Sequence, residues 1–189
     1  TSGNCSTYKE FAAGIMPDKK GVISNPGCIY PDTAQTIADQ FTLNSYVWHG
    51  YHEDMVNKFG PANCAHPENN GVDEPEKGGY AASRNPFVYF RSLLDLGDCA
   101  LNDVDLTKLK TDLNKADKTP AFSFIAPNLC NAGVPGQCAD GEPDGPAAAD
   151  TFLKSYVPAI LKSPAYKKDG LLVITFGEVH AAAEANVPT

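Results

Sequence analysis

Apolar residues occur along the chain in two patterns, short continuous runs and a longer helical spacing. Residues 121–126 and 171–176 are nearly continuous apolar runs, which predict strands buried on both faces. Residues 45–51 alternate enough to predict a shorter strand. Between the two runs, residues 147–166 place apolar side chains at helical spacing and predict a long helix that Pro158 bends. This order predicts a β-α-β unit with parallel strands and a right-handed crossover.

Shorter helical segments and two irregular stretches fill the rest of the chain. Helical spacing, or a proline at a first turn, predicts helices that begin at Pro31 and that cover residues 86–95 and 105–113. Residues 1–30 and 60–79 collect turn-forming residues without periodicity and are predicted to be loops. The predicted fold class is therefore α/β, a mostly parallel sheet flanked by helices, with long loops tied by disulfides.

The charge balance limits the partners that the chain can bind. The formal net charge is −8, with 23 acidic and 15 basic residues. A general nucleic-acid binder needs a basic surplus to neutralise phosphates, so no nucleic-acid partner is predicted. A small anionic or phosphorylated ligand needs only a local positive site and is compatible with this charge. No apolar run approaches the roughly 18 residues of a membrane span, so none is predicted.

Six cysteines bear on the compartment in which the protein folds. They include no C-x-x-C pair, which does not favour a zinc centre. An even number in a loop-rich chain favours disulfides and a secreted protein, extracellular or periplasmic. The alternative is a set of buried free thiols in a cytosolic protein. The sequence leaves the pairing open; sequential pairing encloses a loop each time, and we therefore expect Cys5–Cys28, Cys64–Cys99 and Cys130–Cys138.

Two loops follow the predicted buried strands and are expected to converge. Asn128 and Asn131 follow the first strand, and Gly177 and Glu178 follow the second. The carboxyl ends of parallel strands meet at one edge of a sheet, where ligands bind in α/β proteins. These residues are therefore candidates for a binding or catalytic site. The alternative is that the asparagines serve only as turn formers.

A third candidate loop contains Arg84 and Asn85, directly before Pro86 at a predicted helix start. Backbone N–H groups at a helix start favour anions, and an arginine can bind a phosphate or carboxylate through two hydrogen bonds. The sequence thus predicts an anion contact at Arg84 and Asn85. The alternative is a surface arginine with Asn85 as the helix N-cap.

Two further groups of polar residues give weaker signals. His49, His52 and Glu53 stand among aromatic residues and share no obvious ligand face, so a packed strand end is the plainer interpretation. Glu178 and His180 stand two apart, but no third ligand lies near them in the sequence. Glu178 is the one candidate metal ligand, and no metal site is predicted with it alone.

Several segments, taken in this order, resemble the bacterial secreted phosphoesterase family of acid phosphatases and phospholipase C-type enzymes. The matching stretches are residues 28–31, 36–40, 48–55, 80–90, 124–131, 152–161 and 170–176. Among them are Trp-His-Gly-Tyr-His-Glu, Asn-Pro-Phe-Val-Tyr-Phe and Phe-Ile-Ala-Pro-Asn. The resemblance implies the core of the alkaline-phosphatase-like superfamily and, for the family, metal-dependent hydrolysis of phosphate esters.

The chain departs from the family's motifs at the positions that would carry the chemistry. Where the family reads Arg-His-Asn-Pro-Phe, Ser83 and Arg84 replace the first two residues. Where it reads Asn-Asp-Gly-His-Asp, residues 131–135 read Asn-Ala-Gly-Val-Pro. Where it reads Thr-Phe-Asp-Glu, Gly177 replaces the aspartate and Glu178 remains. The family's metal-binding amino-terminal strand, its nucleophile segment and its carboxy-terminal strands are expected outside the chain.

Asn131 and Glu178 are then the remnants of catalytic motifs, and a divalent metal centre needs more oxygen or nitrogen ligands than these. We therefore predict one phosphoesterase-like domain over residues 1–189 that is catalytically silent and holds no metal cofactor. It would bind a small anionic ligand or a partner through Arg84, Asn85 and Asn128. One alternative is an active hydrolase completed by further chain or by a partner. Another is an assembly protein whose open sheet edges pair with a second copy.

Overall fold

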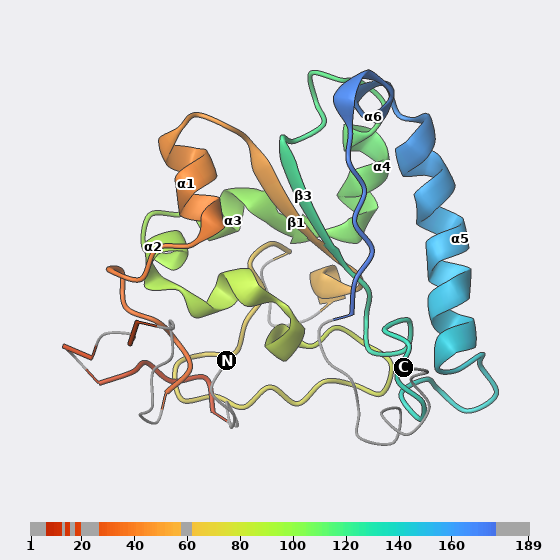
Figure 1. Cartoon of the computed structure of the whole chain (residues 1–189). Coiled ribbons are helices and arrows are strands. Elements are labelled where there is room, and N and C mark those ends of the chain that lie inside the picture. The colour runs from red at the N-terminus through yellow and green to blue at the C-terminus, as the bar shows by residue number, and fades with distance from the viewer. Residues whose placement is uncertain (1–6, 13, 16–17, 20–26, 58–61, 177–189) are drawn as a thin grey trace.

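A parallel sheet of three strands lies at the centre of the computed structural model, which describes residues 7–12, 14–15, 18–19, 27–57 and 62–176 (Figure 1). The strands are β1 (Trp48–His52), β2 (Asp103–Asp105) and β3 (Phe122–Ala126), in the order β2-β1-β3. Both neighbours of β1 are parallel to it. The predicted α/β class with a parallel sheet is thus confirmed.

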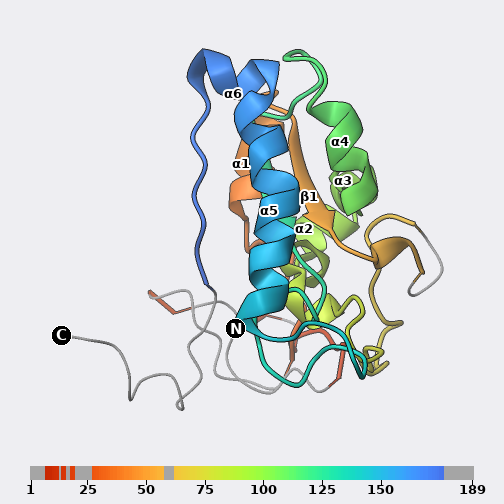
Figure 2. The same cartoon turned by 90° about the vertical axis from the view of Figure 1, so that its right-hand side faces the viewer.

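Helices flank the sheet on both sides. The α-helices are α1 (Ile37–Leu43), α2 (Arg91–Leu94), α3 (Asp98–Asn102), α4 (Leu109–Asp112), α5 (Pro146–Lys162) and α6 (Pro164–Asp169). Short 3₁₀ helices are η1 (Met55–Asn57), η2 (Ala82–Arg84), η3 (Pro86–Tyr89) and η4 (Leu106–Lys108). Figures 1 and 2 place α4 and α5 on one side of the sheet and α1 to α3 on the other. None of the helices in the described residues is long and apolar enough to cross a membrane.

Strand β1 supplies side chains to two separate cores because successive residues of a strand point to opposite faces. On the α1 side, the rings of Trp48 and Phe87 pack with their centroids 4.7 Å apart. On the other side, Tyr51 packs in a cluster with Phe152 of α5. Gly50 leaves no room for a side chain, since a Cβ there would lie 2.6 Å from the Phe87 ring. The central strand is therefore buried along its whole length.

Local capping explains where two predicted helices begin and end. The helix predicted from Pro31 begins only at Ile37, because Thr36 and Asp39 form a capping box at that point. The helix predicted over residues 147–166 is divided into α5 and α6, since Ser163 leaves the helical conformation and caps α6. Both differences are local, and neither changes which side of the sheet a helix covers.

The strand predicted over residues 171–176 is not formed, and the β-α-β unit ends at α6. The segment carries no strand pairing among the described residues, and it runs back past the sheet as an extended chain (Figures 1 and 2). Leu171, Val173 and Phe176 are 87%, 70% and 74% exposed. An apolar strand needs cover on both faces, and the described residues supply no such cover beyond β3. Within the described part of the chain, the outer edge of β3 therefore has no paired strand.

Disulfides tie the long loops to this framework, as predicted. Cys64 and Cys99 are bonded and attach the loop after η1 to α3. Cys130 and Cys138 are bonded and close the loop after β3. Cys28 is also disulfide-bonded, and its predicted partner Cys5 lies outside the described residues. Two of the three expected pairs are thus confirmed.

Candidate ligand-binding site at the carboxyl end of the sheet

Polar side chains meet where β1 and β3 end. Glu53 and Asp54 directly follow β1, and Asn128 stands two residues after β3. The Asn128 backbone N–H donates to Glu53 Oε2 at 3.0 Å, and the Asn128 amide donates to Asp54 Oδ2 at 2.7 Å. The Asn131 amide nitrogen lies 3.1 and 3.0 Å from the two carboxylate oxygens of Glu53. Asn128 and Asn131 therefore lie at this edge of the sheet, whereas the second loop of the predicted convergence, Gly177 and Glu178, lies outside the described residues.

An open cavity of about 500 Å³ lies against this cluster. Its lining comes from the ends of β1 and β3, from the disulfide-closed loop and from the start of α5. The polar lining residues are Asp54, Lys77, Asn128, Asn131, Glu142 and Thr151. Lys77 also pairs with Asp140 at 2.7 Å on the exposed rim. The cavity thus combines amides, carboxylates and one lysine.

Glu53 is the group in this cluster whose acidity is most changed by its surroundings. Burial raises the pKa of its carboxyl, and the nearby charges of Asp54 and Asp105 raise it further. The hydrogen bonds from Asn131 and Asn128 lower it, but the pKa remains raised. A carboxyl of this kind holds a proton at a higher pH than an ordinary glutamate.

Sequence reasoning assigned Glu53 only to a packed strand end and missed its place in this cluster. Trp48, His49, Tyr51 and His52 are indeed buried, as that interpretation predicts. Glu53 differs because it is the first residue after the strand. Its position at the same sheet edge as Asn128 is the signal that could have identified it.

Asn85 belongs to a second cluster, which is sealed inside the molecule. Its side chain is fully buried, accepts from Phe87 N–H at 3.0 Å and so caps η3. It also donates to Asp103 Oδ2 at 2.6 Å and to the Tyr80 hydroxyl at 2.9 Å. His52 Nε2 lies 3.0 Å from the other oxygen of Asp103. The structure thus places Asn85 in the alternative role foreseen for it, a helix cap, and away from the cavity.

Arg84 ends η2 directly before this cap, and it is half-buried. It is not among the residues that line the cavity. Gly177, Glu178 and His180 lie outside the described residues. The structure therefore brings Asn128 and Asn131 together, and it separates Arg84 and Asn85 from them.

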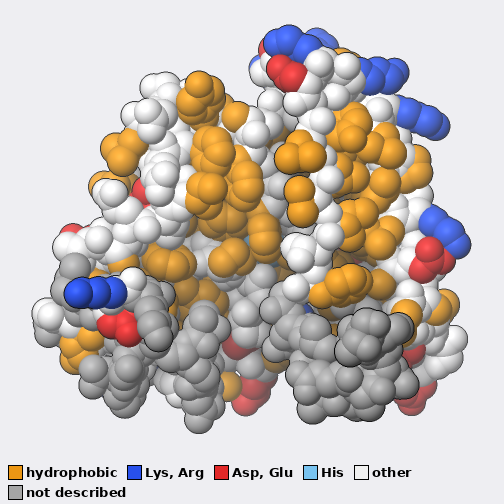
Figure 3. All heavy atoms as spheres, in the orientation of Figure 1, with side chains coloured by type: hydrophobic (Ala, Val, Ile, Leu, Met, Phe, Trp, Pro, Cys, Tyr) orange, Lys and Arg blue, Asp and Glu red, His pale blue; other side chains and the backbone are white. Residues whose placement is uncertain are grey.

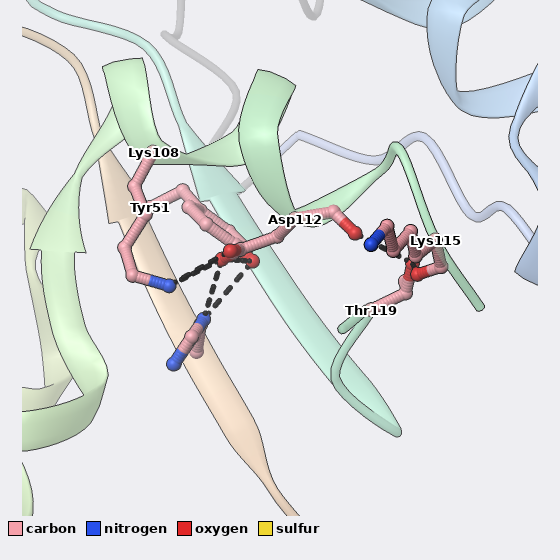
Figure 4. A network of polar contacts seen from close by, with 6 residues as sticks. Tyr51, Lys108, Asp112, Lys115 and Thr119 are labelled. Atoms are coloured by element: carbon pink, nitrogen blue, oxygen red, sulfur yellow. Dashed lines mark hydrogen bonds and ion pairs between the residues drawn. The ribbon is translucent and has the colours of Figure 1, made fainter. Parts of the chain in front are cut away.

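A third polar cluster lies on the opposite face of β1 (Figure 4). The Tyr51 hydroxyl donates to Asp112 Oδ2 at 2.8 Å, His49 Nδ1 lies 3.1 Å from the same oxygen, and Lys108 Nζ lies 2.6 Å from it. Burial lowers the pKa of His49, and the Lys108 charge lowers it further. Burial alone would raise the pKa of Asp112, but Lys108 and Tyr51 hold it below its usual range. This cluster joins α4 to the sheet.

Among the described residues, one group of side chains lies close enough together to offer three ligands to a metal ion: Cys64, Cys99 and Asp103. The two sulfurs of this group are joined in a disulfide. At the cavity, both Glu53 oxygens accept hydrogen bonds from the Asn131 amide. The described residues thus offer no other close set of three such ligands for the divalent metal that the family resemblance implies.

A parallel sheet whose carboxyl edge borders a polar cavity is the arrangement in which α/β enzymes and binding proteins hold their ligands. A model of the phosphoesterase family matches residues 12–181, and the chain therefore belongs to that family. This confirms the family that the sequence motifs indicated.

Two curated relatives agree with this assignment. The chain is 27% identical over 168 residues to a phosphate-repressible acid phosphatase of Penicillium chrysogenum, covering 89% of this chain and 37% of the relative. It is 25% identical over 150 residues to an acid phosphatase of Aspergillus niger, covering 78% of this chain and 32% of the relative. The chain thus spans about a third of the length of these relatives. No solved structure matches it significantly.

Proposed function

We propose that this chain is a catalytically silent phosphoesterase-family domain that binds a small phosphorylated ligand in the cavity at the carboxyl end of the sheet. The observation that carries the proposal is the cluster in which Glu53 accepts hydrogen bonds from Asn128 and Asn131, two residues that line that cavity. Lys77 supplies a cation for the phosphate, and the amides and carboxylates of the lining take up hydroxyl groups of the ligand.

Among the described residues that line the cavity, none is an activated nucleophile, and this supports the proposal that the domain is catalytically silent. Thr151 is the one lining hydroxyl, and it donates to the Ala147 carbonyl at 2.9 Å within its own helix. Cys130 is held in a disulfide. Covalent phosphoryl transfer needs a nucleophile with a base in reach, and the site offers Thr151 no such base. Arg84 remains a second candidate anion contact, outside the lining of the cavity.

A second candidate is favoured by the length of the relatives. Because the chain spans about a third of two acid phosphatases, the remaining ligands and the nucleophile would come from further chain or from a partner. In that case the family's divalent metal would bind only in the completed protein. The domain would then be one part of an active phosphoester hydrolase.

Two further points belong to this proposal. The disulfides favour a secreted protein, because such bonds persist in oxidising compartments. The open edge of β3 and the exposed apolar segment 171–176 favour self-association, since an unpaired edge is a template for another strand. Sedimentation of the purified chain over a range of concentrations tests the second point.

The proposal is tested with the purified chain, with inorganic phosphate and p-nitrophenyl phosphate as ligands. We expect NMR shifts in the Asn128 and Asn131 amides on addition of either compound, and no release of nitrophenol with or without divalent metal. Lys77→Gln should weaken the binding severalfold by removing the cation of the lining. Lys9→Gln, an exposed lysine that does not line the cavity, is the matched control.

Each result decides one part of the proposal. Turnover by the isolated chain would contradict catalytic silence. An absence of amide shifts would contradict the ligand-binding role. Turnover that arises only when flanking chain is added would support the second candidate instead.

A further inference from the structure

Lysines gather at the end of the molecule opposite to the cavity. Figures 1 and 2 place α6, the end of α5 and the loop between α4 and β3 at the same end of the molecule, away from the carboxyl ends of β1 and β3. Figure 3 shows lysine and arginine side chains over α6 and the end of α5. We call this region the basic tip; its lysines are Lys115, Lys118, Lys162, Lys167 and Lys168.

The charge of the basic tip is opposite to that of the chain. Asp117 and Asp169 are the acidic residues of the same segments, which leaves a local net charge of +3 on a chain with a net charge of −8. Elsewhere in the molecule the acidic residues are therefore in large excess. A surface of one sign on a protein of the other sign orients the molecule toward an oppositely charged partner.

The lysines of the basic tip are free to act on such a partner. All five side chains belong to exposed residues. Of these five lysines, Lys168 is the one with an ion pair among the described residues. Its partner is Asp169, at 4.0 Å, and both side chains are largely exposed. By contrast, Lys108 and Lys154, which lie outside the basic tip, contact Asp112 and Asp150 at 2.6 and 2.5 Å.

Exposed apolar side chains adjoin the basic tip, and they restrict the kinds of polyanionic partner that fit this surface. Leu161 precedes Lys162 in α5 and is 41% exposed, and Leu171, two residues after α6 ends, is 87% exposed. Nucleic acids and acidic polysaccharides offer charge but no apolar layer to receive leucines. An anionic bilayer offers both, because lysines bind its headgroups while leucines enter the boundary of the acyl chains.

We propose that the basic tip is a docking surface for an anionic phospholipid bilayer. Lys115 and Lys118 approach the headgroups from the loop, and Lys162, Lys167 and Lys168 approach them from the helices. Leu161 and Leu171 insert beside them. The carboxyl edge of the sheet, with its cavity, then faces away from the bilayer and stays open to solvent. This inference is independent of what the cavity binds.

The test measures binding of the purified chain to phosphatidylcholine vesicles with and without phosphatidylserine. We expect binding only to vesicles that contain phosphatidylserine, and a loss of that binding as salt rises well above about 0.1 M, where the Debye length is about 10 Å. Each lysine near an anionic bilayer contributes about 1 kcal/mol, a factor of about five, so Lys167→Glu with Lys168→Glu should weaken binding at least about 25-fold. Leu171→Ser should weaken it severalfold.

The matched control is the pair Lys9→Glu and Lys19→Glu, which changes the net charge equally in the amino-terminal segment at the other end of the molecule (Figure 1). This pair should leave vesicle binding unchanged. An equal loss in both double variants, or no binding to phosphatidylserine vesicles, would overturn the proposal. Binding to heparin or to duplex DNA without vesicle binding would assign the basic tip to a different polyanion. Circular dichroism of each variant shows that it has folded.

Discussion

A buried carboxylate, Asp112, and a half-buried one, Glu53, lie beside strand β1, and the pKa values of the two are shifted in opposite directions. Asp112 contacts His49, near the start of the strand, and the hydroxyl of Tyr51, and its pKa is lowered. Glu53 follows the last residue of the strand, and its pKa is raised. Both carboxylates accept hydrogen bonds, and in both the effect of burial taken alone is to raise the pKa.

The difference comes from the charges beside each carboxylate. Burial acts to raise the pKa of Asp112, but Lys108 at 2.6 Å, together with the Tyr51 hydroxyl and His49, lowers it by more. Glu53 has amides for partners, and Asp54 and Asp105 add negative charge near it. One end of the strand is thus neutralised and closed. The other keeps an uncompensated carboxyl beside a cavity, which is where a binding or catalytic site needs a responsive group.

Removal of the Asp112 carboxylate should disrupt its cluster with His49, Tyr51 and Lys108, and it should cause the largest loss of stability among these variants. Asp112→Ala leaves Tyr51 and His49 without their shared acceptor and Lys108 without its counter-ion. We expect the free energy of unfolding to fall by about 2–4 kcal/mol, because buried partners are left unpaired. Urea unfolding at neutral pH measures this change.

The control for this variant is Asp150→Ala. Asp150 and Lys154 also form a pair four residues apart on a helix, but both side chains are exposed. Exposed pairs of this kind contribute about 0.3–0.5 kcal/mol, so the control should lose little. Equal losses in the two variants would show that burial of the Asp112 cluster adds nothing.

Removal of the cation should make Asp112 behave more like Glu53. With its pKa lowered, Asp112 contributes stability above its ordinary pKa, and this stability is lost as pH falls below that value. Lys108→Gln should raise the pKa of Asp112 and also that of His49, which the Lys108 charge lowers. NMR titration of both groups measures this, and we expect about 1 kcal/mol less stability at neutral pH.

Lys110→Gln is the matched control, because Lys110 lies in α4 with Asp112, is exposed and makes no ion pair among the described residues. It should leave both titrations where they are. If neither pKa moves in Lys108→Gln, the opposite shifts of Asp112 and Glu53 have a cause other than the lysine.

The sequence predicted this central architecture where local pattern and burial agree. The apolar run of residues 121–126 predicted β3, and the alternation over residues 45–51 predicted β1, which the structure places at Trp48–His52. Cys64–Cys99 and Cys130–Cys138 followed from the loops that they enclose. The position of Asn128 and Asn131 at the carboxyl edge of the sheet followed from the strand that precedes them.

Elements that depend on distant partners could not be predicted in this way. Strand β2 is Asp103-Val-Asp105, and its acidic residues give no apolar pattern. It is held in the sheet by buried acceptors: Asp103 accepts from Asn85, and Asp105 accepts from the Val56 N–H. The strand prediction for residues 171–176 was wrong for the converse reason. A strong apolar pattern forms a buried strand only where neighbouring elements cover it.

The smallest expected effect is that of a substitution at Glu53, the residue that follows the carboxyl end of β1. A raised pKa means that the folded state favours protonated Glu53, so burial of its charge costs stability at neutral pH and this cost disappears as pH falls below the raised pKa. Glu53→Gln removes the charge and keeps the shape, and the Asn131 amide can turn to match the new amide. The variant should therefore be equal to or up to about 1 kcal/mol more stable than the natural chain at pH 7. Its advantage should shrink toward pH 4.

Urea unfolding at several pH values measures this difference, and Glu142→Gln is the control because Glu142 lines the cavity itself and is exposed. The control should show no comparable trend. An advantage of Glu53→Gln that grows as pH falls would mean that the pKa of Glu53 is lowered, as in Asp112. The contrast between the two ends of β1 would then fail, and with it the case for Glu53 as the responsive group of the cavity.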